Sequence, residues 1–254
     1  MITQGTGRPV VLLHGVTSSC HAWQDVIPFL SKDYKVYAFT ALGHNGAKAP
    51  QGRIELSDVI DDMTRTFDKH HLSQPYIVGN SMGAWVAIEL AKRGRASGVC
   101  AISPAGIWHV AKSEQTLALK QIKYLSRLAT VSLPFISFLS QFKTVRKFAL
   151  KKIAEHGDNL TPAQFKQAVV DMCRCSVKKD ILNTQQSLSA GKLDCPITLV
   201  WPDKDKLFPI DSTAILAQQM FPNAAFIKLA NLGHVPMIDD PKQIADVIKA
   251  SMTT

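Results

Sequence analysis

The stretch VGNSMGAW, residues 78–85, raises the question that decides the fold: why does Ser81 stand between Gly79 and Gly83, directly after an apolar run? One interpretation is a strand-to-helix turn whose glycines only relieve crowding. The other is a nucleophile elbow, a tight and strained turn that exposes the serine hydroxyl. A five-residue pattern also occurs by chance. The rest of the chain must therefore supply a base, an acid and an oxyanion site.

The composition is typical of a globular protein that buries a sizeable core. The chain has 254 residues, of which 46% are hydrophobic and 19% charged. Its N-terminal region lacks the pattern of a secretory signal, and no segment offers the roughly 18 apolar residues of a membrane span. The five cysteines have irregular spacing, which predicts neither a disulfide framework nor a metal site. We therefore expect a cytoplasmic protein.

Short apolar runs alternate with helical patterns along most of the chain. Runs of this kind are typical of strands buried on both faces, and the alternation predicts an α/β fold. We expect a mostly parallel sheet with helices on both faces. Helices are predicted from Ser57 to His70, from Gly83 to Arg93 before Gly94, from Asp211 to Met220 and from Pro241 to Ser251. The predicted strands are Val10–His14, Lys35–Thr40, Tyr76–Val78, Gly98–Ser103, Ile197–Trp201 and Ala225–Leu229.

The alternation stops over residues 106–188, which are helical in pattern and basic. We interpret this segment as a helical cap, or lid, inserted into a core made of residues 1–105 and 189–254. The net charge is +9, and residues 105–190 alone hold ten lysines and three arginines against five acids. Lys120, Lys123 and Arg127 share one helical face. That face is either solvated above a helix packed on the core, or it recruits substrate at an anionic lipid surface.

Reactive side chains in parallel sheets gather at the carboxyl ends of strands. Here Ser81 follows one predicted strand, Asp203 and Asp205 follow a later one, and His234 follows the last. A serine, an acid and a histidine in that order are the sequence of one class of catalytic triad. No dinucleotide or phosphate-binding motif is present, and the basic segment lacks a nucleic-acid-binding motif.

Five motifs occur in order along nearly the whole chain: VVLLHGVTSS, LGHNG, GNSMGAW, WPDKDKLFP and LGHVPMIDDP. Together they resemble the α/β-hydrolase-fold serine hydrolases of the esterase and lipase type. Two departures concern loop detail. Thr40, Ala41 and Leu42 precede Gly43 where the family often has D-x-R, and Pro202 replaces a usual glycine.

The resemblance implies a catalytic triad. Ser81 is the expected nucleophile, and His234 is the base that later serves as the acid. The family's acid stands four residues before a proline, and Pro209 therefore selects Asp205 over Asp203.

The resemblance also implies an oxyanion hole made by the backbone N–H groups of Val16 and Met82. His14, Trp108 and His109 are the candidate substrate-binding residues. His14 is expected to order the oxyanion loop rather than to perform chemistry.

The predicted activity is hydrolysis of carboxylic esters through an acyl-enzyme on Ser81, with lipid-like or medium-chain acyl groups. The substrate is a small-molecule ester, and neither a cofactor nor a metal is expected. Two alternatives remain open: a carbon–carbon bond hydrolase with the same triad, and a ligand-binding, receptor-like member with little turnover. Epoxide hydrolases of this fold use a carboxylate at the elbow, which this chain lacks. The oligomeric state is not predicted.

Overall fold

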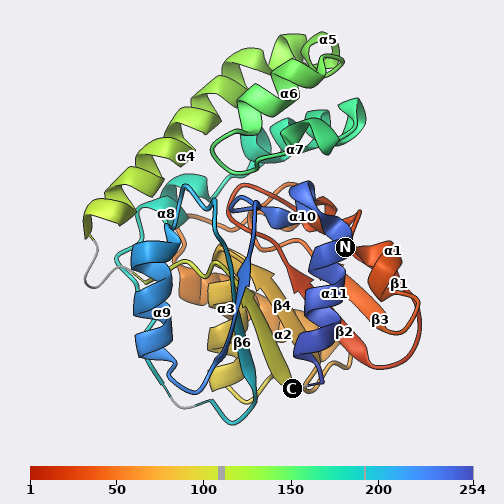
Figure 1. Cartoon of the computed structure of the whole chain (residues 1–254), viewed down its shortest axis with the longest axis vertical. Coiled ribbons are helices and arrows are strands. Elements are labelled where there is room, and N and C mark those ends of the chain that lie inside the picture. Colours follow the sequence, from red (N-terminus) through yellow and green to blue (C-terminus); the bar gives the residue numbers. More distant parts are fainter. Residues whose placement is uncertain (108–111, 192, 254) are drawn as a thin grey trace.

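The computed structural model describes residues 1–107, 112–191 and 193–253. A seven-stranded sheet runs through the molecule in the order β1-β3-β2-β4-β5-β6-β7, and helices lie on both of its faces (Figure 1). Only β1 is antiparallel to its neighbour; every other pair is parallel. The predicted α/β fold class is therefore confirmed. The strands are β1 (Ile2–Gln4), β2 (Pro9–Leu13), β3 (Lys35–Phe39), β4 (Tyr76–Asn80), β5 (Gly98–Ile102), β6 (Ile197–Pro202) and β7 (Ala225–Leu229).

Two apolar cores sandwich the sheet. One core holds buried side chains of α2 (Leu56–Lys69), α3 (Met82–Lys92) and α9 (Ile215–Met220). The other holds those of α1 (Ile27–Leu30) and α11 (Pro241–Ser251). Every residue of β4, β5 and β6 is buried, which explains why these strands are nearly continuous apolar runs.

All six predicted strands are present, with ends shifted by one or two residues. The structure adds β1, a short and mostly exposed edge strand that has no apolar pattern to reveal it. It also corrects the start of α2. Glu55, not Ser57, is the N-cap, and its N–H donates to an Asp58 carboxylate oxygen at 2.8 Å in a capping box. The helix predicted from Asp211 begins as the π-helical turn η4 (Ile210–Ala214) before α9.

The cap stands over the carboxyl ends of the strands (Figure 1). Within residues 106–188, the described part contains helices and no strand. A small apolar cluster of its own joins residues of α4, α5, α6 and α7. The domain boundaries at 105 and 189 stay predictions. The cap helices are α4 (Lys112–Ser132), α5 (Ile136–Leu139), α6 (Lys143–Leu150), α7 (Pro162–Arg174) and α8 (Lys178–Leu182), with the 3-10 turns η2 (Leu133–Phe135) and η3 (Gly157–Asn159). Outside the cap, η1 (Cys20–Trp23) and α10 (Pro236–Asp239) complete the chain.

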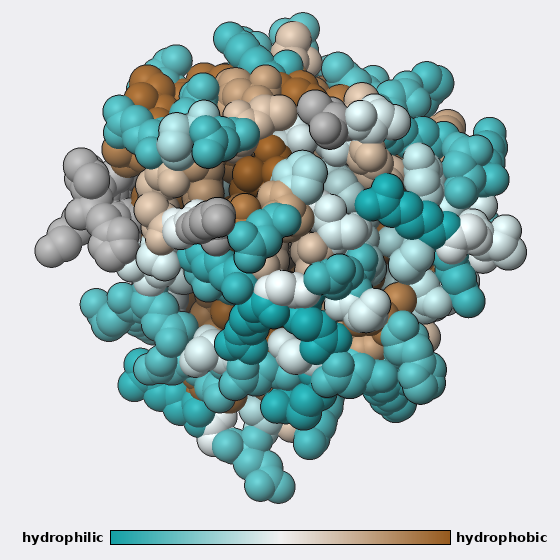
Figure 2. Space-filling model, turned by 90° about the horizontal axis from the view of Figure 1, so that it is seen from below, coloured by the Kyte–Doolittle hydropathy of each residue, from teal (hydrophilic) through white to brown (hydrophobic). Residues whose placement is uncertain are grey.

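The end of the molecule opposite the cap presents mostly hydrophilic side chains (Figure 2). Across the part of the chain that the structure describes, no helix has the length and apolar character needed to cross a bilayer.

The glycines of the GNSMG motif allow β2, β4 and α3 to approach one another closely. A Cβ atom on Gly79 would lie 2.2 Å from the Gly83 carbonyl oxygen. A Cβ atom on Gly83 would lie 2.2 Å from the carbonyl oxygen of Leu13, at the end of β2. Both obstructing atoms belong to the backbone, so no side-chain rotation could relieve the clash. The two glycines hold the start of α3 against the ends of two central strands.

Replacing Gly83 by alanine is expected to lower the free energy of unfolding by about 3 kcal/mol or more, because backbone segments would have to separate. Gly94→Ala, at the other end of the same helix, is the matched control. It meets open space and carries only the strain of its φ of +69°, about 1 to 2 kcal/mol. Urea unfolding of both variants measures the difference. Equal losses would contradict the close approach.

Candidate active site

Ser81 lies in a strained turn between β4 and α3. Its φ of 56° and ψ of −116° fall where few residues other than glycine are found. Hydrogen bonds of both its backbone N–H and its backbone carbonyl hold Ser81 in this conformation. The Ser81 N–H donates to the Ile102 carbonyl at 2.9 Å, and its own carbonyl accepts from the N–H groups of Ala84, Trp85 and Ala105. Both interpretations of the motif therefore apply: the glycines relieve crowding, and the serine is held in an elbow.

His234 is joined to Asp205 by a short, fully buried hydrogen bond. The distance from Nδ1 to Oδ2 is 2.7 Å, and the two side chains are 4% and 0% exposed. The other oxygen, Oδ1, accepts from the N–H groups of Leu207 and Phe208, each at 2.8 Å. A carboxylate can only accept, so Nδ1 carries a proton; in the neutral imidazole this makes Nε2 the acceptor. The Phe208 ring packs edge-on against the imidazole at 4.9 Å.

Asp203, the other acid of this loop, serves the turn. Its Oδ1 accepts from the Asn231 N–H at 2.7 Å, and its own N–H donates to the Leu229 carbonyl. The structure thus brings Asp205, not Asp203, to the histidine.

The loop that carries His234 is fixed by groups that the sequence did not single out. The Asn80 side-chain amide donates to the His234 carbonyl at 2.9 Å. Asp239 is buried and accepts from the Gly233 N–H and from the His156 N–H, both at 2.7 Å. Asn80 adjoins Ser81 in the quoted motif, and Asp239 lies within LGHVPMIDDP. Their positions inside these two motifs were the only feature of the sequence that could have indicated a role for Asn80 and Asp239.

The two proposed oxyanion donors lie on either side of Ser81. Val16 follows β2 and lines the cavity above the serine, and Met82 opens α3. Across the described residues, neither of these N–H groups donates to a protein acceptor. The start of α3 adds the partial positive charge of a helix N-terminus. The site can therefore stabilise negative charge that develops beside Ser81.

His14 is a support beneath the oxyanion loop. Its Nδ1 donates to the Gly15 carbonyl at 2.7 Å, and its Nε2 accepts from the Ala41 N–H at 3.0 Å. It is 1% exposed and is not among the residues that line the cavity above Ser81, so its contact with substrate stays a prediction. Burial, together with the neighbouring His44, lowers the pKa of His14 to about 3. The other two candidate substrate-binding residues, Trp108 and His109, lie outside the described residues.

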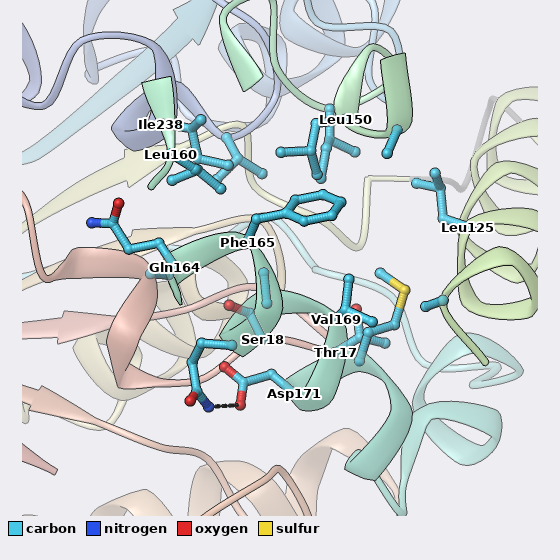
Figure 3. A pocket seen from close by; sticks show the side chains of 18 of the residues that line it. Thr17, Ser18, Leu125, Leu150, Leu160, Gln164, Phe165, Val169, Asp171 and Ile238 are labelled. Carbon is cyan, nitrogen blue, oxygen red and sulfur yellow. Dashed lines mark hydrogen bonds between the residues drawn. The ribbon is translucent and has the colours of Figure 1, made fainter. Parts of the chain in front are cut away.

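A cavity of about 580 Å³ extends from Ser81 and His234 into the cap. Its lining is mainly apolar and comes from α4, α5, α6 and α7 of the cap and from the core loops around Ser81 and His234. Figure 3 shows the Phe165 ring in the middle of this space, with Leu150, Leu160 and Val169 around it. None of the described lining residues is a lysine or an arginine.

A buried acid of the cap, Asp171, borders the same cavity (Figure 3). Its oxygens accept from Ser19 Oγ at 2.6 Å, from Asn45 Nδ2 at 2.7 Å and from Gln167 Nε2 at 2.8 Å. Ser19 and Asn45 belong to core loops that follow β2 and β3, and Gln167 lies on α7. The carboxylate therefore ties the cap to the core beside the oxyanion loop. No motif contains this residue, and sequence reasoning missed it.

Comparison with known proteins places these features in a family. The sequence model of the alpha/beta hydrolase family matches residues 10–247. The chain is 26% identical over 204 residues to epoxide hydrolase EphH of Mycobacterium tuberculosis, covering 74% of this chain and 90% of that protein. It is 23% identical over 267 residues to a pimeloyl-[acyl-carrier protein] methyl ester esterase of Nitrosomonas europaea, covering 98% and 97%. A thermophilic esterase from Thermogutta terrifontis has a similar fold, with a TM-score of 0.76 at 17% identity over 99% of this chain and 92% of that one.

The neutral state of His14 predicts a pH-dependent stability. Below pH 6.5 the unfolded chain binds a proton at this position that the folded protein does not bind until about pH 3. Folded stability is therefore lost as the pH falls, by about 1.4 kcal/mol per pH unit for one proton.

His14→Gln removes this titration, so the variant does not lose this part of its stability as the pH falls. The difference in unfolding free energy between the wild type and the variant should therefore become smaller from pH 7 to pH 4.5. Urea unfolding at several pH values measures it. His156→Gln, with an exposed side chain, is the control. Wild-type and His14→Gln curves that run parallel would contradict the buried neutral state.

Proposed function

The chain belongs to the alpha/beta hydrolase family, and we propose that it hydrolyses carboxylic esters through an acyl-enzyme on Ser81. One observation carries the proposal. A strained serine and a histidine bonded to a buried carboxylate border the same apolar cavity. An activated hydroxyl in that setting is suited to acyl transfer.

In the proposed reaction, the Ser81 hydroxyl attacks the ester carbonyl while His234 Nε2 accepts its proton. Asp205 stabilises the imidazolium that forms and keeps the ring in the required tautomer. The imidazolium then gives its proton to the departing alcohol as the carbon–oxygen bond breaks. Water enters, loses a proton to His234 and attacks the acyl-enzyme. The carboxylic acid leaves, and Ser81 regains its proton.

Charge on the carbonyl oxygen is proposed to be stabilised by the N–H groups of Val16 and Met82. Removing one such donor in serine hydrolases typically costs about 10²- to 10³-fold in turnover. His14 contributes indirectly, because its two hydrogen bonds hold the backbone at Gly15 and Ala41.

The cavity favours an uncharged, apolar acyl group. Its described lining is largely aliphatic and aromatic, and its charged members are the acids Asp25 and Asp171. An anionic acyl group would meet negative charge there and no cation. The described basic residues of the cap lie outside this lining, which therefore favours an apolar over an anionic acyl group.

The relatives include both esterases and epoxide hydrolases, and the serine at the elbow favours an ester. One relative's name describes a methyl ester esterase, and a solved neighbour is an esterase. The epoxide hydrolase relative raises the other chemistry, but a carboxylate nucleophile is absent from the elbow here. A carbon–carbon bond hydrolase would use the same three residues, so assays should include both substrate classes. A receptor-like protein would turn over neither.

Ser81→Ala is expected to lower turnover of a medium-chain nitrophenyl ester on the order of 10⁴-fold, since the remaining groups cannot form the acyl-enzyme. A fluorophosphonate should label the wild type at Ser81 and leave the variant unlabelled, as read by mass spectrometry. Unfolding curves control for folding. Equal labelling of both proteins would refute the assignment.

Asp205→Asn and Asp203→Asn form a matched pair. In the first, the new amide can donate to His234 Nδ1, so the proton moves to Nε2 and the base is lost. Turnover should fall on the order of 10³- to 10⁴-fold. In the second, Asp203 touches only the turn, and turnover should change less than about tenfold. Steady-state kinetics decide, and the reverse ranking would assign the acid to Asp203.

A further inference from the structure

Exposed apolar side chains gather on the cap. Among the described residues, nine large hydrophobic side chains are exposed, and seven of them lie between residues 124 and 148. Exposed groups of this size that cluster usually mark a surface that contacts something apolar. The other two exposed large hydrophobic residues of the described chain, Met1 and Ile215, are far from this segment in the sequence. We name the cluster the apolar rim; its members are Tyr124, Leu128, Val131, Phe135, Phe138, Phe142 and Phe148.

Basic residues border the apolar rim, and acids are absent. From residue 115 to residue 154 the sequence contains six lysines, two arginines and no aspartate or glutamate. Arg146 is buried and donates to the Ser140 carbonyl. We name six exposed cations of this segment the basic flank; they are Lys120, Lys123, Arg127, Lys143, Lys147 and Lys151.

The helical spacing separates these two sets on α4. Leu125 and Ala129 are buried on one face, whereas Lys123 and Arg127 are exposed on another. The rim residues of α4 lie between those faces at spacings of three and four. On α6, Phe148 is exposed and the Lys151 ammonium lies 3.9 Å from its ring centre. Apolar groups and cations thus alternate as adjoining stripes on one surface.

The cavity opens at the apolar rim. Tyr124, Leu128 and Phe148 line the cavity above Ser81, and each of them is also more than two-fifths exposed. Phe138 belongs to α5, at the end of the cap farthest from the sheet (Figure 1). The cavity and the apolar rim thus share three exposed residues.

We propose that the apolar rim and basic flank dock the protein onto an anionic lipid bilayer, with the cavity mouth facing the lipid. The rim inserts among acyl chains, and the flank binds phosphate headgroups, the pairing typical of interfacial amphipathic surfaces. The absence of acids over the segment supplies the charge complementarity. Delivery of a lipid-like ester from the bilayer to Ser81 rests on the proposed function; the docking itself does not.

Vesicle flotation tests the docking without turnover. The wild type should float with vesicles of phosphatidylglycerol in phosphatidylcholine at low salt and stay behind with pure phosphatidylcholine. Physiological salt should weaken binding, because charges are then screened over about 8 Å. Lys143→Glu/Lys147→Glu should bind at least about tenfold more weakly, since each cation near an anionic surface contributes about fivefold. Lys32→Glu/Lys69→Glu changes the net charge equally on the core and should bind like the wild type.

The apolar rim has its own matched pair. Phe138→Ser/Phe142→Ser should bind vesicles at least about tenfold more weakly, because two exposed rings that do not line the cavity are lost. Ile215→Ser, an exposed apolar residue of α9, is the control. Hydrolysis of a short, soluble nitrophenyl ester should be unchanged in all of these variants.

The outcomes separate the two proposals. Wild type that does not float with anionic vesicles at low salt refutes the docking, whatever its esterase activity. Equal loss in the core and cap charge variants also refutes it, because net charge alone would then explain binding. Binding to an acidic protein with no vesicle binding would assign the surface to a protein partner and overturn the proposal. A protein that floats as expected but hydrolyses no ester retains the docking and refutes the proposed function.

Discussion

The contact on which the site depends is backbone against backbone. The start of α3 touches the ends of β2 and β4 at Gly79 and Gly83, where a single Cβ would lie 2.2 Å from a carbonyl oxygen. That approach forces the chain to turn within one residue, and Ser81 absorbs the strain. It also sets the Met82 N–H beside the loop that carries Val16. The positions of Ser81 and of the proposed oxyanion donors therefore share one geometric cause.

The histidine depends on a wider set of neighbours. Asp205 holds the ring, Asn80 holds the carbonyl, and Asp239 holds the preceding glycine. These three residues come from different parts of the chain, and all three are buried. Buried polar groups that are fully bonded restrict a site to one arrangement. The position of His234 thus depends on a strand end, a loop and a short helix that converge on it, and not on β7 alone.

The periodicity of the sequence and the order of its motifs were enough to predict the main strands and the main residues of the candidate site. The central strands β4, β5 and β6 were predicted because burial on both faces makes them apolar. Motif order indicated Ser81 and His234, and the spacing to Pro209 indicated Asp205. Features set by tertiary contact were missed. The edge strand β1 is exposed, and the Glu55 cap competes with an equally plausible Ser57. The hydrogen bonds of His14 were not predicted, because its two backbone partners, Gly15 and Ala41, meet only in the folded chain. Asp171 has no local pattern at all.

The cap directly contacts the two loops of the proposed site, the oxyanion loop and the loop that carries His234. Asp171 on α7 accepts a hydrogen bond from Ser19 Oγ beside the oxyanion loop. The Ile153 carbonyl accepts one from the Val235 N–H, next to His234. A Cβ on Gly233 would lie 2.8 Å from the Ala154 backbone. Lifting the cap to admit or release a bulky molecule would therefore break restraints at both loops together. The arrangement of the residues around Ser81 and His234 would then be complete only while the cap is closed.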